Sequence, residues 1–176
     1  MNLLVIGGCA SGKSAFAESA AQKLGGSLVY VATMPVVSPE DAKKVERHHR
    51  LREGKGFVTL ERQGHLAGLP DNGGTILIES IETYVANIMF APGADPLDTA
   101  RWAEELKSEL EPIILRNNNT VWVSSSVDCD GIQYSQETEA YKKVLNDINC
   151  YLAEKSDAVI EMVCGIPVRI KGDFPC

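Results

Sequence analysis

Several features are scarce in this chain of 176 residues, and each scarcity excludes a class of protein. No apolar run approaches about 20 residues, so we expect no membrane-spanning helix. The N-terminus lacks the basic start and the cleavage site of a signal peptide. The five cysteines are odd in number and include no C-x-x-C pair, which argues against a zinc site and a disulfide framework. Reduced thiols favour a cytoplasmic location.

Positive charge is also in deficit, because 17 lysines and arginines stand against 24 acidic residues and leave a net charge of −7. A polyanion such as duplex DNA is therefore not expected as a partner. The remaining composition, 44% hydrophobic and 23% charged, is ordinary for a globular protein. The length fits a single domain over residues 1–176.

Segments of strand character and helix character alternate along the chain. The expected strands are 3–6, 27–33, 57–61, 75–79, 120–125, 158–163 and 167–170. The expected helices are 14–24, 38–53, 80–90, 97–115 and 138–155, the fourth with Trp102, Leu106 and Leu110 on one face, and a turn is expected over 117–119. Continuous apolar strands alternating with helices predict an α/β fold whose mostly parallel sheet is covered on both faces. The last two strands predict a terminal hairpin, joined by Gly165-Ile166.

The first strand leads into a motif that fits G-x-x-x-x-G-K-[ST] at every fixed position. The motif consists of Gly7, Gly8, Cys9, Ala10, Ser11, Gly12, Lys13 and Ser14. Small residues let successive backbone N–H groups cradle phosphate oxygens, Lys13 should reach the β- and γ-phosphates, and the Ser14 hydroxyl should bind Mg²⁺. An ordinary glycine-rich turn is the alternative, but the place between a buried strand and a helix favours a nucleoside triphosphate site. The fold is therefore expected to be a three-layer fold of the P-loop NTPase type.

Two carboxylates end predicted strands. Glu79 closes a continuous apolar strand, where P-loop proteins commonly place a carboxylate that orients Mg²⁺ or its water shell. An acid at the N-terminus of the following helix explains Glu79 equally well. Glu61 ends its strand in a similar way and is the weaker candidate.

Two of the three histidines are adjacent in the segment Arg47-His48-His49-Arg50-Leu51-Arg52. On a helix, His49 falls on the face of Ala42 and Val45, whereas His48 points about 100° away. A neutral imidazole can attack phosphorus, and neighbouring guanidinium groups can neutralise charge on phosphates. The alternative is a solvated helix face with incidental histidines.

The segments GGCASGKS, YVATM, RHHR, FVTLE and ILIESIETYVANIMF, in this order, resemble the adenosylcobinamide kinase/adenosylcobinamide-phosphate guanylyltransferase family. The resemblance covers the first half of the chain, to about Phe90, and returns weakly in the terminal VCGIPVRIK. It implies two activities: phosphorylation of the aminopropanol hydroxyl of a corrinoid, and transfer of GMP from GTP to the resulting phosphate in cobalamin nucleotide-loop assembly.

The resemblance also implies roles for individual residues. His48 matches the histidine that becomes guanylylated in the family. The further positions that match nucleotide contacts of the family are Ala32, Thr33, Met34, His49, Arg50, Leu51, Arg52, Glu61 and Glu79. GTP, ATP and Mg²⁺ are the implied nucleotides and metal, with Ser14 and Glu79 at the metal. The implied substrate is a small corrinoid, and the implied assembly is a homotrimer.

The chain departs from the family pattern in three places. Ala10 stands where the phosphate loop of the family usually carries arginine. Ser124-Ser125-Ser126-Val127-Asp128 replaces a typical Thr-Asn-Glu-Val-Gly stretch, and Tyr141-Lys142-Lys143-Val144-Leu145 replaces Arg-x-Phe-Arg-Asp. These changes leave open a variant that keeps one of the two activities. Another small-molecule P-loop kinase is the alternative function, and a non-catalytic nucleotide-binding module is a third.

Overall fold

The computed structural model describes residues 1–35, 38–69, 71, 73–116, 119–127 and 131–174. Within the second helix, some residues are described by their backbone alone. Their side chains lie outside the described part of the chain: Asp41, Lys43, Lys44, Arg47, His48, His49 and Leu51.

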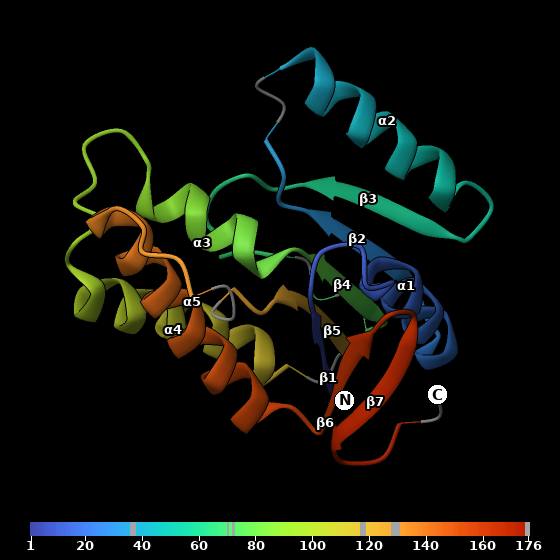
Figure 1. The fold of residues 1–176 in the computed structure, drawn as a ribbon. Helices are drawn as coiled ribbons and strands as arrows, with labels where there is room; N and C mark the ends of the chain where they lie inside the picture. The colour runs from blue at the N-terminus through green and yellow to red at the C-terminus, as the bar shows by residue number, and fades with distance from the viewer. Residues whose placement is uncertain (36–37, 70, 72, 117–118, 128–130, 175–176) are drawn as a thin grey trace.

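One seven-stranded sheet forms the centre of the structure, in the order β3-β2-β4-β5-β1-β6-β7 (Figure 1). The strands are β1 (Asn2–Gly7), β2 (Leu28–Ala32), β3 (Phe57–Glu61), β4 (Thr75–Glu79), β5 (Asn119–Ser125), β6 (Ala158–Val163) and β7 (Ile166–Lys171). Every neighbouring pair is parallel except β6 and β7, which form an antiparallel hairpin. The predicted mostly parallel sheet with a terminal hairpin is confirmed.

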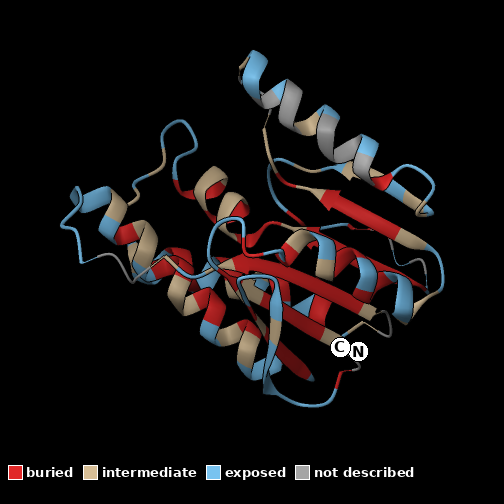
Figure 2. Cartoon of the chain, turned by 45° about the vertical axis from the view of Figure 1, so that its right-hand side comes forward, coloured by how far each residue is buried: buried red, intermediate tan, exposed pale blue. Residues whose placement is uncertain are grey.

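Helices connect the strands and cover both faces of the sheet. They are α1 (Lys13–Leu24), α2 (Pro39–Arg52), α3 (Ile81–Met89), α4 (Thr99–Ile114) and α5 (Gln136–Lys155). One core cluster joins α1 to one face, where Ala17 packs with Leu3 and Val5. The other joins α3, α4 and α5 to the opposite face. Figure 2 shows the buried residues concentrated in the central strands and on the sheet-facing sides of these helices.

Local sequence explains where the longest helices lie. Trp102, Leu106 and Leu110 are all buried, so the predicted apolar face of α4 is confirmed. Helix α5 begins at Gln136, two residues before the predicted start, because the Ser135 hydroxyl accepts a hydrogen bond from the backbone N–H of Thr138 and caps the helix.

Two expected turns differ from the structure. Asn119 belongs to β5 rather than to a turn, because its backbone N–H donates to the Gly74 carbonyl; residues 117–118 lie outside the described part. The terminal hairpin turns at Cys164 and Gly165, with φ of 50° and 83°, and β7 already begins at Ile166. Positive φ at both central residues is the geometry that matches the twist of a two-residue hairpin.

Among the helices in the described part of the chain, none combines the length and the apolar character that crossing a membrane requires.

Candidate functional site

The motif at the N-terminus forms the loop between β1 and α1. Gly7 has no room for a side chain, since an added Cβ would lie 2.5 Å from the Met162 carbonyl oxygen. Ala10 and Gly12 adopt left-handed conformations, with φ of 54° and 93°. Left-handed residues at alternate positions are a feature of the backbone nests that bind anions through their N–H groups.

Lys13 is buried, and its ammonium group closes the loop from inside. Its Nζ donates to the carbonyl oxygens of Gly7 at 3.0 Å and of Gly8 at 2.7 Å. The loop therefore holds a cation at its centre.

The terminal hairpin supports the same loop from outside. The backbone N–H of Gly165 donates to the Ser11 carbonyl at 3.0 Å. A Cβ at Gly12 would lie 3.5 Å from the Cα of Gly165, so the turn packs directly on the loop. The phosphate loop is therefore held in place by the turn between β6 and β7, which lies far from it in sequence.

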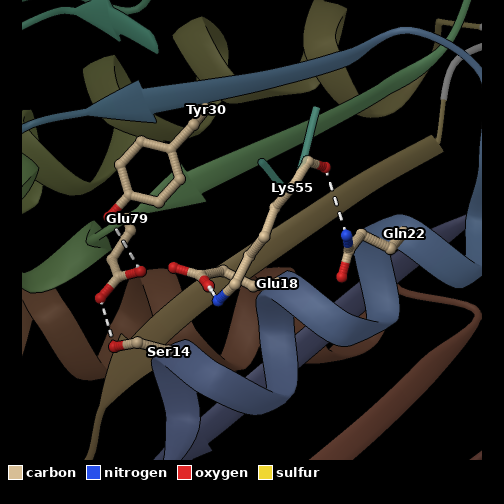
Figure 3. A network of polar contacts seen from close by, with 6 residues as sticks. All are labelled: Ser14, Glu18, Gln22, Tyr30, Lys55 and Glu79. Carbon is tan, nitrogen blue, oxygen red and sulfur yellow. Dashed lines mark hydrogen bonds and ion pairs between the residues drawn. The ribbon is translucent and has the colours of Figure 1, made fainter. Parts of the chain in front are cut away.

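A carboxylate from β4 meets the first turn of α1 (Figure 3). The Ser14 hydroxyl donates to Oε1 of Glu79, and the Tyr30 hydroxyl donates to Oε2 at 3.0 Å. Burial, and then the negative charge of Glu79, raises the pKa of Tyr30 far above its ordinary value, so its hydroxyl stays a donor. Glu79 is therefore held by a donor on each oxygen, facing the phosphate loop.

Strand pairing brings the other predicted positions to the same edge of the sheet. Ala32 at the end of β2 pairs with Glu61 on one side and with Glu79 on the other. The Thr33 hydroxyl donates to the Ser80 carbonyl at 2.9 Å and accepts from the Ser80 backbone N–H at 2.8 Å. Glu61 is exposed, whereas Thr33 is fully buried.

Arg52 lies at the C-terminal end of α2, over the Tyr30 ring, with 3.6 Å from its Cζ to the ring centroid. The residue is only 5% exposed, and among the described residues its Nε and Nη1 find no hydrogen-bond partner. It borders a cavity of about 100 Å³. The cavity is lined by Tyr30, Ala32, Met34, Val45, Arg52, Glu79, Ser80 and Thr83. Two buried N–H donors thus lie beside an apolar recess.

Helix α2 carries the adjacent histidines at the edge of the sheet, beside β3 (Figure 1). The side chains of His48, His49 and Leu51 lie outside the described part, so the predicted orientation of the histidines stays a prediction. Arg50 is exposed and forms an ion pair with Glu46.

The turn after α2 is fastened to α1 (Figure 3). Lys55 forms an ion pair with the buried carboxylate of Glu18, and its carbonyl accepts a hydrogen bond from Gln22 at 3.2 Å. With Arg52 stacked on Tyr30, these contacts fix the C-terminal end of α2 to the body of the protein.

Sequence reasoning missed Tyr30, Glu18 and Lys55. Glu18 lies one helical turn after Ser14, which was the available signal for a residue near the site. Nothing in the sequence pairs Tyr30 with Glu79, because their contact depends on the register between β2 and β4.

No group of three or more His, Cys, Asp or Glu side chains that could hold a metal ion occurs within the described residues. The oxygens of Ser14 and Glu79 nevertheless suit Mg²⁺, which binds proteins through one or two hard oxygen ligands and takes the rest from phosphates and water. The donor set therefore fits a magnesium ion that arrives with a nucleotide.

A mostly parallel α/β sheet, a phosphate loop after the interior strand β1 and a carboxylate facing that loop define a P-loop nucleotide-binding protein. A comparison with solved structures finds partial similarity of the overall fold to the P4 protein from bacteriophage phi6 in complex with ADP and to the RadB recombinase. The first has a TM-score of 0.49 at 14% identity, over 94% of this chain and 52% of that one. The second has a TM-score of 0.43 at 14% identity, over 91% and 73%.

The family model for cobinamide kinase / cobinamide phosphate guanyltransferase matches residues 3–170, and the chain belongs to this family. The bifunctional adenosylcobalamin biosynthesis protein CobU of Escherichia coli is 29% identical over 97% of this chain and 100% of its own length. CobU of Salmonella typhimurium is 30% identical over the same shares, and CobP of Pseudomonas aeruginosa is 24% identical over 98% and 99%. The protein is thus a bifunctional kinase and guanylyltransferase of cobalamin biosynthesis, as the sequence resemblance predicted.

Proposed function

We propose that the loop of residues 7–14 binds the triphosphate for both reactions, and that GMP passes to cobinamide phosphate through a guanylyl group on His48. The observation that carries this proposal is the contact of Ser14 with Glu79 at the loop. It supplies a hydroxyl and a carboxylate to a Mg²⁺ ion where the β- and γ-phosphates of a nucleotide would lie, and the ion would neutralise phosphate charge.

In the kinase step the hydroxyl oxygen of cobinamide attacks the γ-phosphorus, and the bond to the departing nucleoside diphosphate breaks. Lys13 would exchange the carbonyls of Gly7 and Gly8 for the β- and γ-phosphate oxygens, which are stronger acceptors for an ammonium group. Loop N–H groups would bind the remaining oxygens.

In the transferase step a neutral His48 attacks the α-phosphorus of GTP and expels pyrophosphate. The resulting phosphoramidate then passes GMP to the phosphate of cobinamide, and His48 is regenerated. A covalent intermediate replaces one difficult displacement with two easier ones. The fixed end of α2 favours this role, because it keeps the histidine-bearing helix next to the cavity.

The remaining predicted contacts also belong to this proposal. Arg52 offers two buried N–H donors to the nucleotide beside the small cavity. Nucleotide contacts are proposed as well for Ala32, Thr33, Met34, His49, Arg50, Leu51 and Glu61. A homotrimer and a cytoplasmic location stay predictions, the first testable by analytical ultracentrifugation.

The test is incubation with Mg²⁺ and GTP labelled at the α-phosphate, followed by analysis of the protein for acid-labile, alkali-stable label. We expect label on the wild type and on His49→Ala, and none on His48→Ala. Absence of label from the wild type, with GTP binding intact, would contradict the guanylyl-histidine mechanism. GMP transfer to cobinamide phosphate without such label would then indicate direct transfer, with no covalent intermediate on the protein.

A further inference from the structure

A second carboxylate lies at the edge of the sheet that carries the phosphate loop. Glu82 is in the first turn of α3 and is half-buried. Its Oε1 accepts a hydrogen bond from the Ser125 hydroxyl at 2.9 Å. Its Oε2 is shielded from solvent and has no hydrogen-bond partner within the described part of the chain.

Strand register places this carboxylate next to the phosphate loop. Ser125 is the last residue of β5 and pairs with Gly7, the first residue of the loop motif. Asn149 on α5 fixes the strand end, because its Nδ2 donates to the Ser125 carbonyl at 3.1 Å and its Oδ1 accepts from the Ser124 hydroxyl at 2.6 Å. Ser125 is therefore a rigid support for Glu82.

The unpaired oxygen distinguishes Glu82 from a carboxylate with a structural role. Glu109 shows such a role: one of its oxygens accepts from the backbone N–H groups of Leu66 and Ala67, and the other contacts His65. A buried polar atom without a partner destabilises the fold, because the hydrogen bonds that it made to water are not replaced. Such an oxygen is free to accept a donor from a water, an ion or a ligand, and a catalytic role is one of the established reasons for it.

We propose that Glu82 is the proton acceptor of the kinase step and binds the cobinamide hydroxyl through Oε2. This inference rests on the proposed use of the phosphate loop in that step. As the alcohol oxygen forms its bond to the γ-phosphorus, its proton passes to Glu82, and the electron pair of the breaking P–O bond leaves with the nucleoside diphosphate. Ser125 holds Oε1, which leaves Oε2 as the oxygen that accepts the proton.

Tyr141 on α5 does not compete for this proton. Its hydroxyl donates to the backbone carbonyl of Glu82 at 3.1 Å, and burial, followed by the charge of Glu82, raises the pKa of Tyr141 to about 12. The phenol therefore stays protonated at neutral pH and anchors the first turn of α3.

The test compares the two activities separately in Glu82→Gln, which keeps an acceptor for Ser125 and cannot take a proton. We expect kcat for phosphorylation of cobinamide to fall at least about 100-fold, the range of general-base catalysis, with the KM for the nucleotide within about twofold. GMP transfer to cobinamide phosphate supplied directly should stay within about twofold of the wild type. The matched control is Glu104→Gln, an exposed carboxylate on α4.

Kinase activity of Glu82→Gln within twofold of the wild type would overturn the inference, and so would an equal loss of both activities. If Glu82→Gln does not fold, Ser125→Ala carries the test. The loss of its hydrogen bond should lower kcat of the kinase step alone by about fivefold, and an unchanged kinase step would overturn the inference. A wild type without kinase activity would instead contradict the proposed function.

Discussion

The Tyr30 hydroxyl donates a hydrogen bond to Oε2 of Glu79, the proposed Mg²⁺ ligand, and so helps to fix the position of this carboxylate. Tyr30→Phe removes this hydroxyl and keeps the ring on which Arg52 stacks. A hydrogen bond to a charged group contributes about 1.5–3 kcal/mol when both groups are buried. Because Glu79 is half-buried, water can replace part of the bond. We therefore expect the free energy of unfolding to fall by about 1–1.5 kcal/mol.

The same loss should weaken the response to Mg²⁺, because Glu79 is no longer held on both oxygens. A cost of 1–1.4 kcal/mol corresponds to a rise of about five- to tenfold in the Mg²⁺ concentration that half-saturates the kinase reaction. Urea denaturation measures the first effect, and a Mg²⁺ titration at saturating nucleotide measures the second.

A double-mutant cycle with Glu79→Gln separates this contact from a general effect of the substitution. Tyr30→Phe should cost much less in the Glu79→Gln background, where the acceptor carries no charge. Tyr151→Phe, which retains the ring that faces Lys155, serves as the control and should change neither quantity. Stability of Tyr30→Phe within about 0.3 kcal/mol of the wild type, with an unaltered Mg²⁺ titration, would refute the reasoning.

Three further changes test other parts of the site. Gly7→Ala should lower the free energy of unfolding by about 1–3 kcal/mol in urea denaturation, because its Cβ would meet the Met162 carbonyl, whereas Gly8→Ala, with open space around it, should stay within about 0.5 kcal/mol. Arg52→Met should change the free energy of unfolding by less than about 1 kcal/mol, because the removal of two unpaired buried nitrogens offsets the loss of the stack on Tyr30, but it should weaken nucleotide binding by calorimetry. Between pH 10 and 12, stability should fall more steeply with pH in the wild type than in Tyr141→Phe; the folded pKa of about 12 lies above the ordinary value of 10.0, so the unfolded chain loses this proton first. An equal slope in both proteins would contradict the burial of this phenol.

The fold was largely predictable because its strands are short apolar runs between clear breaks. Strands 57–61, 75–79 and 158–163 have the predicted bounds. The predicted bounds are wrong where a single capping side chain or a single backbone angle determines where an element begins or ends. The Ser135 cap extends α5 by two residues that have no apolar pattern. The left-handed conformation of Cys164, uncommon outside glycine, moves the hairpin turn by one residue.

The candidate site was predictable as far as it is local in sequence. The loop of residues 7–14 is contiguous, so its motif alone identifies it. Tyr30 and Glu79 are far apart in sequence and meet because β2 and β4 pair in one register, which no local pattern specifies. The contact of Glu82 with Ser125 depends in the same way on how α3 and β5 lie side by side.

The position of β1 also has a consequence for the order in which the chain folds during its synthesis. Among the strands of this sheet β1 is synthesised first, but it lies between β5 and β6, and the phosphate loop packs on the turn between β6 and β7. β1 has no neighbouring strand until β5 has been synthesised, and its second neighbour, β6, follows later. An unpaired apolar strand can form contacts with other chains. The phosphate loop therefore reaches its final packing only after the residues of the terminal hairpin have been synthesised.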